Sequence, residues 1–345
     1  MMKKVAILVI ILCLGVMVLP SIGAEKIKLK FSTYIPPPPA WEAKEMFVDA
    51  FMEEVTKRSG GRVQWETFWS STLGPPTDQF ELCERGVVDV VMCSPAYEVG
   101  SFPLTTMGEL PFSGPNNIEA CKILKEMYKE GFLKKEWTKV HLIYFYSTDS
   151  WSALTRQKKI MKAEDLKGLK LRAKSIPHIR FLELFGATPV QIGAGEVYMA
   201  LQTGVIEGTL FPQSLIPDLK FHEVSKYNLD LEALVSQDAI YMNIDTWNRL
   251  PKDIQKIFND MFDYSSEAAN TIWQTYHKYF ADNAKNKFGI EHSVIDSAEK
   301  AKMRAKCKVL WEEYIAAEEK RGHPAKAYAN AWREKLIKRG YPTPF

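Results

Sequence analysis

The stretch from Asp165 to Pro212 reads DLKGLKLRAKSIPHIRFLELFGATPVQIGAGEVYMALQTGVIEGTLFP, and its apolar periodicity changes several times. Leu169–Arg172 alternates apolar and basic residues, as a short strand does, and Gly168 before it is a turn residue. After Pro177 the apolar residues recur at helical spacing. The whole pattern predicts a strand at 169–172, a helix after 177, a strand at 188–192, a helix at 196–202 and a strand that opens at 205–206.

This β-α-β-α-β order has short connections, so it predicts a mostly parallel sheet. Ligands of such sheets collect outside the carboxyl ends of the strands. Arg172 lies at or near the end of the first of these strands. A guanidinium in that place can hold a carboxylate with two parallel, charge-assisted hydrogen bonds. The alternative interpretation is an ordinary surface arginine beside a strand.

The motifs GLKLR, GATPV and EVYMALQTGVIEG in this stretch resemble the signature region of the solute-binding proteins of tripartite ATP-independent periplasmic (TRAP) transporters, the DctP family. The resemblance continues in GGRV at 60–63, LPF at 110–112 and WNRLP at 247–251. It implies that Arg172 holds a carboxylate of the transported solute. It also implies a small organic acid as ligand, a small and a large membrane subunit as partners, and uptake driven by an ion gradient.

Three candidate contacts precede this stretch. Trp41 follows a four-proline loop after the first strand, and in the family this loop faces the ligand cleft. Ser94 and Tyr97 come just after a buried strand at 87–92, at a carboxyl end where a ligand would sit. The alternatives are a core tryptophan for Trp41, and a surface loop or core edge for Ser94 and Tyr97.

Three positions depart from the family pattern. Many relatives have an arginine where Trp151 aligns, a phenylalanine where Ala194 aligns and an asparagine where Phe211 aligns. Trp151 and Phe211 thus offer apolar faces where relatives have hydrogen-bonding groups. We therefore expect a mono-anion with a compact apolar or aromatic body, such as a 2-oxo, 2-hydroxy, aromatic or indole acid or a sulfonate, rather than a sugar acid. The alternative is that both aromatics pack in a domain core and never touch ligand.

Met1–Ala24 has the features of a cleaved signal peptide: Lys3 and Lys4 precede an apolar run at 5–19, and small residues close the segment. The apolar run is short for a membrane span, and Cys13 lies inside it without a clean lipobox. We expect export to the periplasm without lipidation; an uncleaved anchor is the alternative. Cleavage would remove two lysines and no acidic residue, which lowers the formal charge from +3 to +1. That balance disfavours a broad nucleic-acid-binding surface.

The pattern as a whole, with the resemblance, predicts an α/β protein with a two-domain, class II-like periplasmic-binding-protein fold. Each domain is expected to be a mixed, mostly parallel sheet flanked by helices, and hinge strands and one long spanning helix should join the two. The expected first domain comprises residues 25–148 and 237–276. The expected second domain comprises residues 149–236 and 277–345, the C-terminal helices included.

Motifs of catalysis are missing from the sequence: it has no GxSxG, HExxH, P-loop or GxGxxG. The six histidines are scattered, and His178 is expected as a solvent-facing helix start, with a place facing the cleft as the alternative. The cysteines after residue 24 form no CxxC, so free thiols are expected, although an exported chain could oxidise them. We therefore expect no enzyme, no metal site and no cofactor.

Two other functions stay open at this point. An exported two-domain enzyme acting on a small organic anion would reveal itself by turnover of bound acids. An exported ligand sensor with the same fold would differ mainly in its partner. Genes for two TRAP membrane subunits beside this one would separate the receptor from the sensor.

Overall fold

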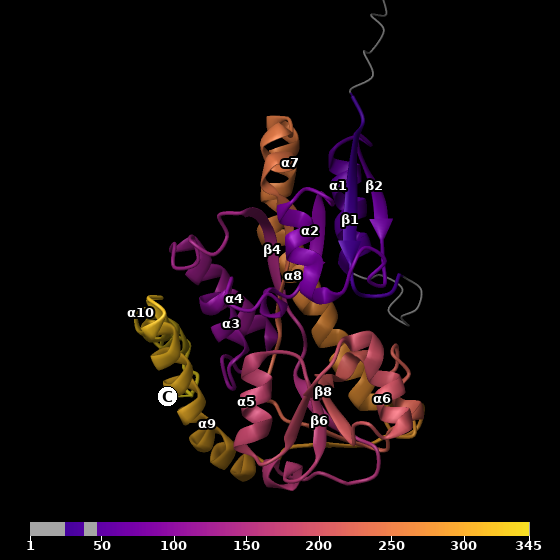
Figure 1. Ribbon diagram of the computed structural model, residues 1–345, viewed down its shortest axis with the longest axis vertical. Coiled ribbons are helices and arrows are strands. Elements are labelled where there is room, and N and C mark those ends of the chain that lie inside the picture. The colour runs from indigo at the N-terminus through magenta and orange to yellow at the C-terminus, as the bar shows by residue number, and fades with distance from the viewer. Residues whose placement is uncertain (1–24, 38–46, 345) are drawn as a thin grey trace, which may run out of the picture.

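The computed structural model describes residues 25–37 and 47–344, which form two β-sheets flanked by helices (Figure 1). The first sheet has five strands in the order β2-β1-β3-β10-β4, and the second has six in the order β11-β9-β5-β8-β6-β7. In Figure 1 the first sheet lies in the upper half of the molecule and the second in the lower half. This is the two-domain α/β architecture that the sequence predicts.

The first sheet combines parallel and antiparallel strands. Its strands are β1 Ile27–Thr33, β2 Val63–Phe68, β3 Val90–Cys93, β4 Val140–Ser147 and β10 Gln237–Asn243. β1 pairs in parallel with β2 and β3, whereas β10 runs antiparallel between β3 and β4. Its helices are α1 Phe47–Arg58, α2 Gln79–Glu84, α3 Pro103–Thr106, α4 Asn117–Lys129 and α7 Ile244–Arg249. The return of β10 to this sheet places residues 237–243 in the first domain, as the sequence predicts.

The second sheet contains the predicted β-α-β-α-β run. Its strands are β5 Trp151–Thr155, β6 Lys170–Ala173, β7 Thr188–Gln191, β8 Gly208–Pro212, β9 Tyr227–Asp230 and β11 Glu291–Val294, with helices α5 Ile176–Leu184 and α6 Val197–Thr203. β6 is parallel to β7 and β8. Gly208 opens β8 where a Cβ would lie 2.4 Å from the carbonyl oxygen of Leu154, so this close approach of β8 to β5 requires glycine.

Two strands of this sheet are absent from the sequence prediction. β5 runs antiparallel between β8 and β9, and all five of its residues are buried. Its sequence Trp-Ser-Ala-Leu-Thr lacks the alternation of a half-exposed strand, because both faces are covered. β11 pairs with β9 in parallel at the sheet edge and has only four residues. A run this short carries little periodic signal.

Helix α8, Lys252–Asn283, spans both halves of the protein, as predicted. Its Phe258 and Met261 pack in the core of the first sheet. Its Phe280 packs in the core beside α6 and β8 of the second sheet. Residues of this helix thus contribute to the cores of both domains.

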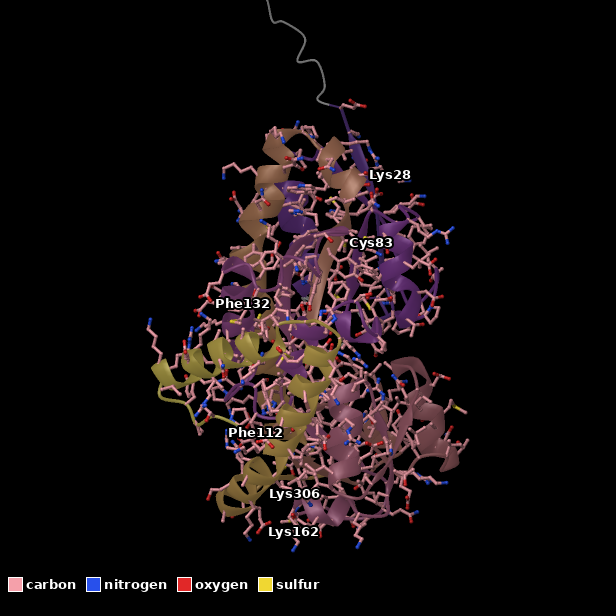
Figure 2. All side chains as sticks on the ribbon, turned by 60° about the vertical axis from the view of Figure 1, so that its left-hand side comes forward. Lys28, Cys83, Phe112, Phe132, Lys162 and Lys306 are labelled. Carbon is pink, nitrogen blue, oxygen red and sulfur yellow. The ribbon has the colours of Figure 1, made fainter. Side chains whose placement is uncertain are left out.

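The C-terminal helices α9, Ser297–Lys320, and α10, Ala325–Lys338, are shared between the two domains. Cys307 of α9 packs against the second sheet, whereas Trp311 of α9 and Trp332 of α10 belong to the core of the first sheet. Figure 2 shows Phe132 of the first domain beside α10, where its ring lies 5.9 Å from that of Tyr328. This packing differs from the expectation that residues 277–345 belong with the second domain, because α10 folds back onto the first.

The four cysteines in the described part of the chain are free and buried: Cys83, Cys93, Cys121 and Cys307. Burial raises the pKa of each thiol, that of Cys307 to about 12. Such thiols are protonated and unreactive at neutral pH. Over residues 25–37 and 47–344, every helix is too short or too polar to cross a membrane.

His277, toward the carboxyl end of α8, links this helix to both connections between the sheets. Its Nδ1 lies 3.2 Å from Oδ2 of Asp149, which follows β4, and its Nε2 lies 3.2 Å from Oδ2 of Asp230, which ends β9. Burial lowers the pKa of His277, but hydrogen bonds to the two carboxylates and their charges outweigh burial and raise it to about 10. Partial burial lowers the pKa of the neighbouring His292. His277 is therefore a partly buried cation at neutral pH, held between two buried carboxylates.

We expect His277→Gln to lower the free energy of unfolding by about 3–5 kcal/mol at pH 6, since it leaves Asp149 and Asp230 buried without their cation. The folded-state pKa lies above the unfolded value of about 6.5, so the stabilisation is complete below that pH. It should be lost at about 1.4 kcal/mol per pH unit as the pH rises toward 10. Urea denaturation of both proteins from pH 6 to pH 9 measures this loss. His323→Gln, at a partly exposed histidine, is the control; a difference that does not change with pH would contradict the assignment.

Candidate ligand-binding site

A cavity of about 90 Å³ lies between the two domains. It is large enough for several water molecules or one small organic ligand. Residues of both sheets, of the connections between them and of α8 line it: Tyr34, Ile35, Pro36, Met92, Tyr97, Tyr146, Thr148, Trp151, Arg172, Lys174, Ala194, Gly195, Phe211, Pro212, Leu215, Leu219, Ser236, Asp238 and Trp273. The cavity is therefore mostly apolar and aromatic, with a few charged groups.

Arg172 reaches the cavity from the carboxyl end of β6 and is only 1% exposed. Its Nε donates to the carbonyl oxygen of Ile192 at 3.1 Å, and its Nη atoms lie 3.5 Å from the carbonyl oxygen of Leu210 and from Oη of Tyr97. These partners among the described residues are all neutral. A buried charge without a counter-charge is costly. An anion in the cavity would supply the missing charge.

Trp151, Phe211 and Ala194 all line the cavity. The guanidinium carbon of Arg172 lies 5.0 Å from the ring centre of Phe211 and 5.9 Å from that of Trp151. The two rings lie 5.8 Å apart with an interplanar angle of 29°. The indole Nε1 of Trp151 donates to Oγ1 of Thr148 at 2.8 Å, which fixes the ring in place. These aromatics form an apolar wall beside the cation.

The other three predicted contacts have different outcomes. Tyr97 lines the cavity from the first domain, opposite Arg172. Ser94 does not line it: its Oγ lies 3.2 Å from the carbonyl oxygen of Gln237 and accepts from the backbone of Ala96, so it shapes the turn that carries Tyr97. Trp41 lies outside the described residues.

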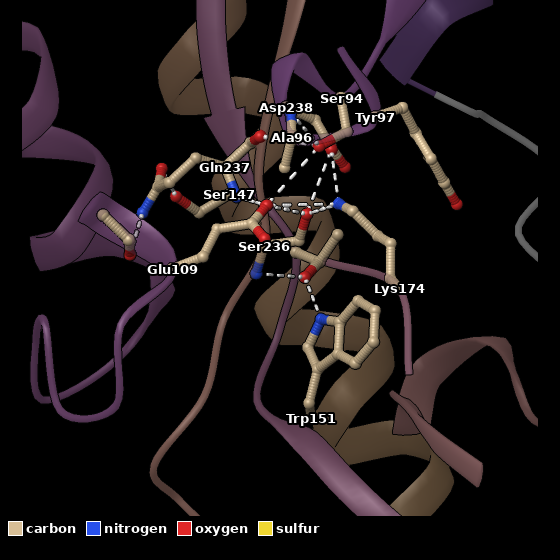
Figure 3. A network of polar contacts seen from close by, with 12 residues as sticks. Ser94, Ala96, Tyr97, Glu109, Ser147, Trp151, Lys174, Ser236, Gln237 and Asp238 are labelled. Carbon is tan, nitrogen blue, oxygen red and sulfur yellow. Dashed lines mark hydrogen bonds and ion pairs between the residues drawn. The ribbon is translucent and has the colours of Figure 1, made fainter. Parts of the chain in front are cut away.

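A buried ionic network, missing from the sequence prediction, borders the cavity (Figure 3). Nζ of Lys174 lies 3.2 Å from Oε1 of Glu109 and 3.2 Å from Oδ1 of Asp238, and it also donates to Oγ of Ser236. All four residues are at least nine-tenths buried. Burial lowers the pKa of Lys174, but the charges of Asp238 and Glu109 outweigh burial and raise it above its ordinary value. Lys174 belongs to the second domain and both carboxylates to the first, so the network joins the domains.

His178 lies behind this site and not in solvent. It is fully buried in α5, and its ring centre lies 4.2 Å from that of Trp151. Burial lowers the pKa of His178, and the charges of Lys174 and Arg172 lower it further, so its ring is neutral. The sequence prediction of a solvent-facing helix start was wrong, because α5 packs its first turn against β5. His178 therefore packs against the Trp151 ring.

No cluster of histidine, cysteine, aspartate or glutamate within the described ranges has the composition of a metal site. The charged residues that line the cavity are instead Arg172, Lys174 and Asp238, and Lys174 already engages Asp238. Such a set suits the binding and orientation of an organic anion.

Comparison with known proteins gives one consistent family. A model described as bacterial extracellular solute-binding protein, family 7, matches residues 38–318. A solute-binding protein of Verminephrobacter eiseniae is 29% identical over 216 residues. That alignment covers 62% of this chain and 64% of the relative, slightly less than two thirds of its length.

Two solved structures extend the similarity to the fold. A TRAP solute-binding protein from Rhodoferax ferrireducens, in complex with copurified benzoate, is 25% identical with a TM-score of 0.85, and the match covers 91% of this chain and 99% of that one. A TRAP periplasmic solute-binding protein from Desulfovibrio salexigens, an open complex, is 28% identical with a TM-score of 0.77, and the match covers 91% and 96% of the two chains.

Proposed function

The chain belongs to the bacterial extracellular solute-binding proteins of family 7, and we propose on this premise that it is the extracytoplasmic receptor of a TRAP transporter. It binds a small organic acid in the cavity between its domains and delivers the acid to the small and large membrane subunits. The observation that carries this proposal is Arg172, a buried guanidinium at the end of β6 that faces the cavity and has only neutral partners among the described residues. Its fork suits a carboxylate.

The place of action in this proposal is the periplasm, where TRAP solute-binding proteins work. Residues 1–24 would direct export and be removed. The relatives found by comparison are solute-binding proteins rather than enzymes, which agrees with the missing catalytic motifs. Mass spectrometry of the exported protein is expected to give an N-terminus near Ala24 or Glu25.

Binding would be coupled to closure of the two domains. Arg172 and Trp151 belong to the second domain, whereas Tyr97 belongs to the first, and all three border one cavity. A ligand that contacts both sides is held fully only when the domains are together, so it shifts the population toward the closed form. The closed form would then present a surface built from both domains to the membrane subunits.

The walls of the cavity support a narrower ligand class. Trp151 and Phe211 offer aromatic faces near the guanidinium, and Ala194 leaves room beside them. We propose that the ligand is a mono-anion with a compact apolar or aromatic body. A polyhydroxylated acid would leave hydroxyl groups without partners against these faces, at about 1–3 kcal/mol for each buried group. Benzoate in the structure from Rhodoferax ferrireducens is an acid of the favoured kind.

A thermal-shift screen of organic anions tests this ligand class, since a ligand that binds only the folded protein raises the melting temperature. Benzoate, phenylacetate and indole-3-acetate are expected to stabilise the protein more than glucuronate or sialic acid. Trp151→Ala and Phe211→Ala should each weaken the aromatic acids by roughly threefold to tenfold, from about 0.5–1.5 kcal/mol of lost ring contact. They should change aliphatic acids less.

Tyr264→Ala is the matched control, because this tyrosine is 52% exposed on α8 and packs against Arg58, away from the cavity. It should leave the ranking of ligands unchanged. A uronic or sialic acid as the tightest ligand would contradict the proposed class. An unchanged ranking of the ligands in both Trp151→Ala and Phe211→Ala would also contradict it. Failure of every organic acid to bind would refute the receptor itself.

A further inference from the structure

Asp238 adds a second element of recognition to the cavity. This carboxylate at the start of β10 is 3% exposed and lines the cavity together with Arg172. Its two close contacts within the described structure, with Nζ of Lys174 at 3.2 Å and Oγ of Ser236 at 3.0 Å, both involve Oδ1. Its Oδ2 receives no hydrogen bond from any described residue.

The N–H donors of Lys174 are all directed to protein acceptors rather than to a ligand. Its ammonium group has three N–H donors, and these are directed to Glu109, Asp238 and Ser236. The Arg172 guanidinium, by contrast, has five N–H donors and three neutral contacts, two of them long at 3.5 Å. The cation available for a ligand carboxylate is therefore Arg172, and Lys174 serves to hold Asp238 in place.

Lys174 already contacts both buried carboxylates, Asp238 and Glu109, whereas Arg172 has only neutral partners among the described residues. A ligand that brought only a carboxylate would pair with Arg172 but would leave Oδ2 of Asp238 without a hydrogen-bond donor. A ligand that also brought a hydrogen-bond donor would satisfy Oδ2, and a bond to an ionised acceptor is the stronger kind.

We infer that the ligand is an organic acid that carries a hydroxyl or N–H donor besides its carboxylate, and that Asp238 accepts from this donor while Arg172 holds the carboxylate. This inference rests on the proposed receptor function and narrows its substrate class. It makes Asp238 a specificity-determining residue. Acids without a donor fit the same aromatic walls but leave Oδ2 unpaired.

Matched pairs of acids test the inference on the unaltered protein. We would compare 3-hydroxybenzoate and 4-hydroxybenzoate with benzoate, and mandelate with phenylacetate, by isothermal titration calorimetry. The methoxybenzoates, which keep the oxygen but lose the donor, complete the panel. The best hydroxy acid is expected to bind at least about tenfold more tightly than its donor-free partner. Equal affinities within each pair would overturn the inference.

Asp238→Asn then identifies the acceptor. A neutral amide accepts a weaker hydrogen bond than a carboxylate, so the preference for the hydroxy acid should fall to about threefold or less. Asp260→Asn, the same change at an exposed position of α8, is the matched control and should keep the full preference. A preference kept in full by Asp238→Asn would overturn the role of Asp238.

The outcomes separate this inference from the receptor proposal. If acids of both kinds bind without discrimination, the receptor function stands and the inference falls. If no acid of the panel binds the unaltered protein, the receptor proposal falls with it. Circular dichroism melting curves of each variant check that the fold is kept, and the comparison on the unaltered protein does not depend on them.

Discussion

Replacing Arg172 by alanine should lower the affinity for the tightest-binding acid by at least tenfold, and Arg172→Lys should do nearly the same. Loss of one partner of a buried, hydrogen-bonded charge pair costs about 2–5 kcal/mol of binding, which corresponds to roughly 30-fold or more. Lysine keeps the positive charge but loses the planar fork that matches a carboxylate. Isothermal titration calorimetry of the two variants measures both effects.

Arg180→Ala is a suitable control for the arginine variants. Arg180 lies nearby on α5, but its side chain is half exposed and pairs with Glu183 and Glu313 on the surface. Surface pairs of this kind contribute about 0–1 kcal/mol, so its removal should leave ligand affinity within a factor of about three. Unchanged affinity in both Arg172 variants would show that the carboxylate binds elsewhere.

Lys174→Met is expected to impair closure of the two domains. In the closed arrangement the substitution leaves Glu109 and Asp238 buried without their cation, whereas in an open form these carboxylates can reach water. Breaking a buried ion pair in this way costs about 3–5 kcal/mol, and the cost falls on the closed state. Ligand affinity should therefore drop by more than about 100-fold. Calorimetry measures the affinity, and small-angle X-ray scattering measures the degree of closure with and without the acid.

Two further variants serve as controls for the Lys174→Met experiment. Lys170→Met changes an exposed lysine at the start of β6, the strand that Lys174 follows, and should bind as the unaltered protein does. Adding Glu109→Gln and Asp238→Asn to Lys174→Met removes the unpaired charges, so closure should largely return, although the preference for hydroxy acids should not. If Lys174→Met closes and binds normally on its own, the network does not hold the domains together.

The sequence predicts those parts of the fold whose signals are local. The run from β6 to β8 follows from alternation at Leu169–Arg172, helical spacing after Pro177 and the glycines that end each segment. The burial of β5 on both faces removes such alternation, so this strand is missed. The position of α10 is missed for a related reason: Trp332 is a plausible core residue for either domain, and only tertiary packing decides between them.

The sequence likewise predicts some residues of the candidate site and misses others. The family resemblance and its departures identify Arg172, Trp151 and Phe211, and the fold brings all three to one cavity. Lys174 and Asp238 are missed because they are 64 positions apart in the chain, and an ion pair at that separation leaves no local pattern. One signal was available: Lys174 follows Arg172 by two residues, the period at which side chains of a strand point to the same face.

The C-terminal helices α9 and α10 hold the two domains together along one side of the molecule. α9 packs on the second domain through Cys307, whereas Trp311 of α9 and Trp332 of α10 pack in the core of the first. Two domains joined along one side can rotate about that side but cannot slide past each other. The cleft should therefore open on the side away from α9 and α10, where α6 lies in Figure 1. In the proposed receptor, solute would enter the cleft from this open side, and a membrane subunit would have to receive it from the same side.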